Sequence, residues 1–350
     1  TAPREGFVYR ERVGPLAGDY VIVASRVWVL VVFVFPIIIV IIAFLRYREY
    51  RDKAGRAAMM NEHVLERLNE GSIRWLSVKW LLDRPADFVL PRRQELERDT
   101  GALIAGEAAV SLLRSKRVAA LSYRWLSAQH PDPNGFHTTE IVRFLRSLSP
   151  GEQPEGLFWD FASLHQKDES GARTDAETAA FKSALSIMSD VYATPDTTVL
   201  QQKQLPADFP SHLPSYDRSG WCTMEQATAS LATEEGGSLS KIGHGHVQLS
   251  ANDRRRPEQM AHLFADEDRT VFVGKGDREA VAKMYAQLYR RVVKHEKAVR
   301  GSLGMSGDIL ALGIYGNNQF VITLLGVLGT ITWGGLAIWW ADRTFFVVVI

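Results

Sequence analysis

The feature that most limits how this chain can fold is an uninterrupted apolar run near its beginning. Residues 27–45 form a stretch of 19 residues without a charged or polar side chain. Because a backbone in hydrocarbon must satisfy its own hydrogen bonds, an isolated run of ~20 apolar residues is typical of a membrane-spanning helix. Pro36 removes one backbone donor and predicts a kink. A buried core helix is the alternative interpretation.

A second apolar run, at residues 320–341, contains 22 residues without a charge. It is rich in glycine, and small residues allow helix backbones to approach closely in lipid. We therefore expect this helix to pack against other membrane protein subunits, with lipid as the surrounding partner. The glycines expected at that helix contact are Gly326, Gly329, Gly334 and Gly335.

Basic residues follow the first apolar run and indicate the topology. Arg46, Arg48, Arg51, Lys53 and Arg56 lie directly after it. Such a bias predicts that the central region lies on the cytoplasmic side, or on the equivalent stromal or matrix side, of a two-pass integral membrane protein. The expected organisation is a tail (1–26), a first membrane helix (27–45), a helical neck (46–116), an α/β domain (117–300) with a loop insertion at about 233–268, a linker (301–319), a second membrane helix (320–341) and a tail (342–350).

Charge and cysteine content exclude several classes of function. Lys and Arg number 41 against 40 Asp and Glu, so the net charge of +1 gives no reason to expect nucleic-acid binding. A single cysteine, Cys222, excludes an intrachain disulfide. His244 and His246 flank a glycine, but no Cys or carboxylate stands at ligand spacing, so we expect no metal. We expect no bound cofactor either.

From Arg117 onward, short apolar runs alternate with helical patterns. This alternation predicts an α/β fold with an open parallel sheet of the flavodoxin-like type. Thr138 and Ser219 are expected to begin two of the helices, and residues 181–192 to form one continuous helix. The predicted strands are residues 118–123, 157–161, 197–201 and 270–273.

Four segments of this region resemble the Toll/interleukin-receptor (TIR) and fungal heterokaryon-incompatibility (HET) domains. One of them, Met188 with residues 191–193, fits the helix that follows the second strand. Residues 120–125, Ala-Leu-Ser-Tyr-Arg-Trp, resemble the opening strand of both families. Residues 158–166, which begin Phe-Trp-Asp, are similar to the second strand and loop of the HET family. Trp221 and Glu225 form the W-x-x-x-E signature of TIR domains. The resemblance covers residues 117–232, about a third of the chain.

The resemblance implies two functions. Some TIR domains assemble with partners, and the leading expectation is a membrane-anchored interaction module that serves as a scaffold or accessory subunit. Others cleave NAD, and the alternative is an NAD glycohydrolase with Glu225 as the catalytic residue and NAD as the substrate. Ligand-binding residues would then be Arg124, Trp125, Asp160 and Trp221. An open cleft at Glu225 favours the enzyme, and a glutamate held by the protein favours the scaffold.

Overall fold

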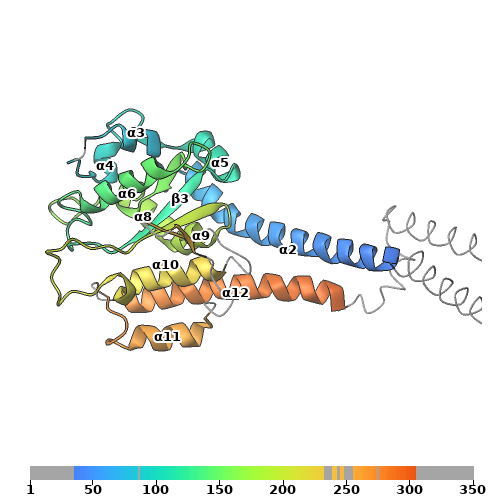
Figure 1. Cartoon of the computed structure of the whole chain (residues 1–350). Helices are drawn as coiled ribbons and strands as arrows, with labels where there is room; N and C mark the ends of the chain where they lie inside the picture. Colours follow the sequence, from blue (N-terminus) through green and yellow to red (C-terminus); the bar gives the residue numbers. More distant parts are fainter. Residues whose placement is uncertain are drawn as a thin grey trace, which may run out of the picture. The chain divides into compact units, whose positions relative to one another are not determined.

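The computed structural model describes residues 35–85, 87–231, 239–242, 245–247, 255–272, 274 and 276–304 (Figure 1). The chain divides into two compact units, residues 1–285 and 286–350. Described residues of the second unit all belong to the carboxyl-terminal part of helix α12 (Asp277–Gly304). All other elements described below belong to the first unit.

Helix α2 (Phe35–Asn69) changes character along its length. Its last turns bury Met60, Val64 and Leu68 in the core. Its first turns leave large apolar side chains exposed on every side. These are Phe35, Ile37, Ile38, Ile39, Ile41, Ile42, Phe44 and Leu45.

Over the described ranges, no helix is both long enough and apolar enough to cross a membrane. The first apolar run, residues 27–45, is described only from Phe35 onward. The second run, residues 320–341, lies outside the described residues together with its four glycines, Gly326, Gly329, Gly334 and Gly335. Both predicted membrane helices therefore stay predictions.

The described residues form a seven-stranded mixed sheet, which confirms the predicted α/β class. The inner strands β4, β3, β5 and β6 run parallel, whereas β1, β2 and β7 join the edges antiparallel. The strand order is β2 (Leu103–Ile104), β1 (Trp75–Ser77), β4 (Gly156–Phe158), β3 (Val118–Tyr123), β5 (Thr197–Gln202), β6 (Leu239–Lys241) and β7 (Gly245–Val247).

Strand β3 occupies the centre because its sequence suits burial on both faces. All six of its residues are buried, as expected for a parallel strand covered by helices on each side. Its full length pairs with β5, from Val118 opposite Thr197 to Tyr123 opposite Gln202. The hydroxyl of Ser122, the fifth residue of this strand, consequently lies inside the protein.

Helices cover the two faces of the sheet. Figure 1 shows α3 (Val78–Leu82), α4 (Arg93–Leu96) and α6 (Phe136–Ser147) on one side of β3, and α9 (Met188–Ala193) and α10 (Gly220–Leu231) on the other. Helix α9 contacts both α2 and α10. The remaining described helices are α5 (Gly106–Arg114), α7 (Asp160–Ser163), α8 (Asp175–Ser186), the 3-10 turn η2 (Tyr216–Arg218) and α11 (Pro257–Ala265).

Residues 46–116, predicted as a helical neck, contribute to the sheet. Leu76 in β1 pairs with Leu157 in β4, and Trp75 donates a hydrogen bond from Nε1 to the Ala109 carbonyl at 3.0 Å. Strand β1 has only three residues, which is too short for an alternating pattern to be visible in the sequence. The region expected to be a loop insertion, 233–268, likewise contains β6, β7 and α11 among its described residues.

Several predicted boundaries are wrong for local reasons. The second strand ends at Phe158 because Asp160 begins α7. The helix expected over 181–192 is divided at Ile187 into α8 and α9. Val271 forms only an isolated parallel bridge with Ser219, so the described part of the predicted last strand, residues 270–272, is not a strand of the sheet.

Helix α6 begins at Phe136, two residues before the expected cap, Thr138. The side chain that accepts its first amides belongs to Asp132. The Asp132 carboxylate accepts from the His137 amide at 3.0 Å and from the Thr138 amide and hydroxyl at 2.8 Å each. The loop after β3 is therefore held against the start of α6 by a fully buried aspartate.

Candidate functional site

Glu225 lies on α10, on the side of this helix that meets strand β3. Its side chain is buried, with 8% of the residue exposed. The Ser122 hydroxyl of β3 donates to Glu225 Oε2 at 2.6 Å. The same hydroxyl oxygen lies 2.7 Å from the Tyr216 hydroxyl. Glu225, Ser122 and Tyr216 thus form a continuous buried chain of hydrogen bonds, named here the serine-centred chain.

The surroundings of Glu225 favour its neutral form. Burial raises the pKa of Glu225 well above its usual range, since a carboxylate loses its hydration inside the protein. The hydrogen bond from Ser122 opposes this rise, and the negative charge of Asp160 adds to it. Burial also raises the pKa of Tyr192, whose hydroxyl donates to the Leu121 carbonyl at 2.9 Å.

Asp160 begins α7 and is bonded at both carboxylate oxygens. Oδ1 accepts from the Tyr123 hydroxyl at 2.8 Å and from the Phe161 amide at 2.7 Å. Oδ2 accepts from Trp125 Nε1 at 2.9 Å. Burial raises the pKa of Asp160, and these hydrogen bonds oppose the rise. Asp160 therefore joins the ends of β3 and β4, and Trp125 is one of its anchors.

Arg124 and Asp160 do not form an ion pair with each other. Arg124 is 8% exposed, and its Nε donates to the Pro214 carbonyl at 3.1 Å. Burial lowers the pKa of this guanidinium. No carboxylate lies within ion-pair distance of Arg124 in the part of the chain that the structure describes.

The other residues of the W-x-x-x-E segment serve separate contacts. Trp221 donates from Nε1 to Asp277 Oδ2 at 3.0 Å, at the start of α12. The Cys222 thiol donates to the Tyr123 carbonyl at 3.3 Å, and burial raises its pKa well above the usual range. A buried neutral thiol is a poor nucleophile, so Cys222 has a packing role.

The expected site is therefore assembled only in part. Asp160 and Glu225 come close enough for the charge of one to affect the pKa of the other. Arg124 and Trp221 bond other groups, the Pro214 carbonyl and the Asp277 carboxylate respectively. Ser122 and Tyr216 were not predicted. Ser122 is visible in the sequence as the only serine or threonine of an otherwise apolar strand, whereas nothing in the sequence marks Tyr216.

No protein-family model, curated protein or solved structure matches this chain. The resemblance to TIR and HET domains accordingly stays a prediction. It is based on residues 120–125 and 158–166, on Met188 with residues 191–193, and on the Trp221–Glu225 pair. Across the described residues, no three His, Cys, Asp or Glu side chains gather as metal ligands would.

The geometry limits the chemistry open to Glu225. Stabilising the cationic ribose that forms when nicotinamide leaves requires an ionised carboxylate that touches the sugar. Glu225 is buried, favours its neutral form and is hydrogen-bonded to Ser122. This is the arrangement of a glutamate held by the protein.

Proposed function

We propose that the chain is a membrane-anchored interaction module, similar to TIR and HET domains, that acts as a scaffold or accessory subunit of a larger membrane assembly. The observation that carries the proposal is the enclosure of Glu225 in the serine-centred chain. A carboxyl that is hydrogen-bonded inside the protein stabilises the α/β domain. The domain would then act through contacts that its outer surface makes with partners. The flavodoxin-like arrangement of the sheet is part of the same proposal.

The exposed apolar surface of α2 supports attachment to a membrane. Ile37, Ile38 and Ile39 are successive residues, so they point to different sides of the helix, and they are 45–49% exposed. Soluble surfaces rarely carry so continuous an apolar cover, so this end of α2 requires lipid or an apolar partner around it. Arg46 follows at once, in the position where a basic residue meets lipid headgroups on the cytoplasmic, stromal or matrix side.

An in-membrane cross-linking experiment tests the proposal. A photoreactive amino acid placed at Ile38 in the full chain should cross-link to lipid or to a membrane subunit. The same probe at Glu107, which is exposed on α5, serves as the matched control and should give no lipid adduct. Lipid or subunit adducts that are no more frequent at Ile38 than at Glu107 would exclude the membrane anchor.

NAD cleavage is the second candidate, and one observation favours it. Carboxyls with raised pKa values gather at catalytic sites. Glu225 and Asp160 both have raised pKa values and lie beside the ends of parallel strands, where open α/β sheets bind ligands. The purified full chain should release no nicotinamide from NAD if the leading proposal is right. Release that disappears in Glu225→Gln, with an unchanged melting temperature, would establish the enzyme instead.

A further inference from the structure

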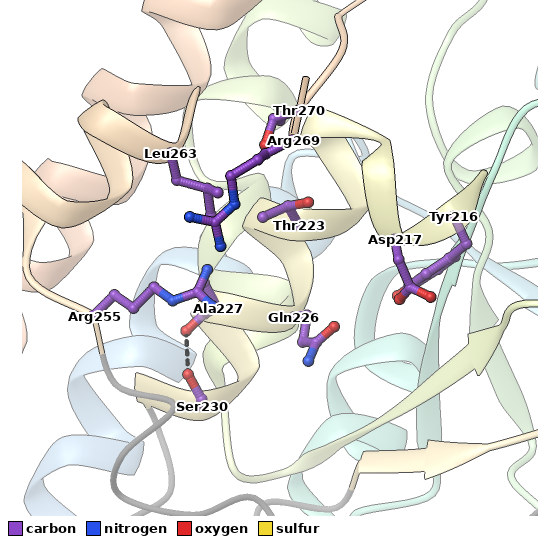
Figure 2. A pocket seen from close by; sticks show the side chains of 10 residues that line it. All are labelled: Tyr216, Asp217, Thr223, Gln226, Ala227, Ser230, Arg255, Leu263, Arg269 and Thr270. Atoms are coloured by element: carbon purple, nitrogen blue, oxygen red, sulfur yellow. Dashed lines mark hydrogen bonds between the residues drawn. The ribbon is translucent and has the colours of Figure 1, made fainter. Parts of the chain in front are cut away.

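A cavity lies on the face of α10 that is turned away from strand β3. Its volume is about 250 Å³, and it is bordered by η2, α10 and the segments before and after α11. Figure 2 shows that Arg255 and Arg269 extend over α10 from opposite sides, with their guanidinium groups turned toward one another. Two cations that share one small cavity repel each other, so an anion between them would be attracted by both.

Neither arginine has a carboxylate partner among the described residues. The acidic residue of the lining is Asp217, and its Oδ1 is paired with Lys203 Nζ at 2.5 Å. The charge of Asp217 is thereby balanced by a residue that does not line the cavity. The cavity itself keeps an excess of positive charge from Arg255 and Arg269.

A buried hydroxyl adds an independent indication of a ligand. Thr270 lines the cavity and is fully buried, and its Oγ1 forms no hydrogen bond within the part of the chain that the structure describes. An unpaired buried hydroxyl is unfavourable, so such groups usually have a partner. A bound oxyanion would accept this hydrogen bond. The amide of Gln226 supplies a further donor at the same cavity.

Hydrogen bonds fix the main chain at both arginines. The Tyr285 hydroxyl donates to the Arg255 carbonyl. Arg269 lies in a turn that two hydrogen bonds close. The Asp266 carbonyl accepts from the Arg269 amide at 3.2 Å and from the Thr270 amide at 2.8 Å. The following Val271 amide donates to the Arg218 carbonyl at 2.8 Å, which ties this turn to η2.

We propose that this cavity binds a small phosphate-bearing anion, held by Arg255 and Arg269 and by the hydroxyl of Thr270. Arginine recognises phosphate through paired N–H donors, which gives both charge and geometry. The volume suits a phosphate or pyrophosphate group and is below the range of pockets that enclose drug-sized ligands. The site is independent of NAD cleavage, since Glu225 lies on the opposite side of α10.

Calorimetric titration of the full chain in detergent with sodium pyrophosphate and with inorganic phosphate tests the site. Saturable binding at one site per chain is expected. Arg269→Gln and Arg255→Gln should each weaken it about tenfold or more, because each removes charge-assisted hydrogen bonds. Arg269→Lys, which keeps the charge but not the paired donors, should give an intermediate loss. Arg278→Gln is the matched control: Arg278 bonds Glu267 at 2.9 Å, does not line the cavity, and should leave affinity unchanged.

Thr270→Val separates a ligand-binding role from a structural one. It should weaken pyrophosphate binding about threefold or more without lowering the melting temperature, because the hydroxyl removed has no partner in the free protein. Absence of saturable binding of either anion, or equal affinity in the parent and in both glutamine variants, would overturn the proposal.

The source of the phosphate is resolved by comparing two probes. A water-soluble short-chain phosphatidylinositol phosphate that binds more tightly than pyrophosphate, and competes with it, would identify a lipid headgroup. Tighter binding of pyrophosphate would identify a soluble phosphate compound. Both results support the phosphate site, and both require that Arg269→Gln weaken the binding of the probe in question.

Discussion

The hydroxyl of Ser122 and the carboxyl of Glu225 join strand β3 to helix α10 through a 2.6 Å hydrogen bond in the interior of the protein. Both residues are buried, and the Tyr216 hydroxyl bonds the same serine oxygen. Ser122 therefore holds three elements together: β3, α10 and η2. The residue that most resembles a catalytic glutamate is in this way a fixed part of the fold.

Ser122→Ala should destabilise the protein by about 1–3 kcal/mol, because Glu225 and Tyr216 lose their shared partner in the interior of the protein. Urea unfolding followed by circular dichroism measures the change. Ser186→Ala is the control, since Ser186 is exposed and bonds only the Ser183 carbonyl. A loss no larger in Ser122→Ala than in the control would mean that the serine-centred chain does not stabilise the fold.

Glu225 should make stability fall as the pH rises. Its folded-state pKa is raised above the ordinary value of 4.5, so the folded protein binds the proton more tightly than the unfolded chain does. The favourable contribution is complete below pH ~4.5 and is lost as the pH rises toward the folded-state pKa. Glutamine cannot ionise, so the free energy of unfolding of Glu225→Gln should change less with pH over that window. Unfolding measured at several pH values tests this. An identical pH dependence in the two proteins would contradict the assignment.

Asp132→Ala should destabilise the protein by about 1–3 kcal/mol because it removes the acceptor for two amides and one hydroxyl at the start of α6. Asp132→Asn keeps one oxygen acceptor and should therefore lose less stability than Asp132→Ala. Thermal unfolding compares these variants with Asp208→Ala, a substitution of an exposed aspartate. Equal melting temperatures for Asp132→Ala and Asp208→Ala would refute the capping role.

Arg93→Lys should be unusually harmful for a conservative change. The buried guanidinium donates to Glu97 Oε1 at 3.0 Å and to the carbonyls of Ser72 at 2.7 Å and Ser163 at 2.9 Å, and it also bonds Gly71. An ammonium group cannot reach all of these acceptors at once, so we expect a loss of about 2–4 kcal/mol. Arg98→Lys, at an exposed site on the same segment, should change stability by less than about 0.5 kcal/mol in the same urea assay.

Local sequence patterns determined the elements whose signal is contained in a few consecutive residues. Strand β3 was predicted at its observed bounds, because six consecutive residues suit burial on both faces of a parallel sheet. Helix α10 was likewise expected to follow Ser219 and end near Leu231. The apolar residues at the start of α2 were recognised from the sequence, although what surrounds them is a proposal.

Only the tertiary structure decided which distant groups meet. Strand β1 pairs with β4 about 80 positions away in the sequence, and Tyr216 reaches Ser122 across 94 positions. Arg124 and Glu225, which the sequence placed in one site, received different partners. The physical reason is that periodicity records only whether a residue faces the core. Buried polar groups select partners by distance and angle, and these exist only after the chain has folded.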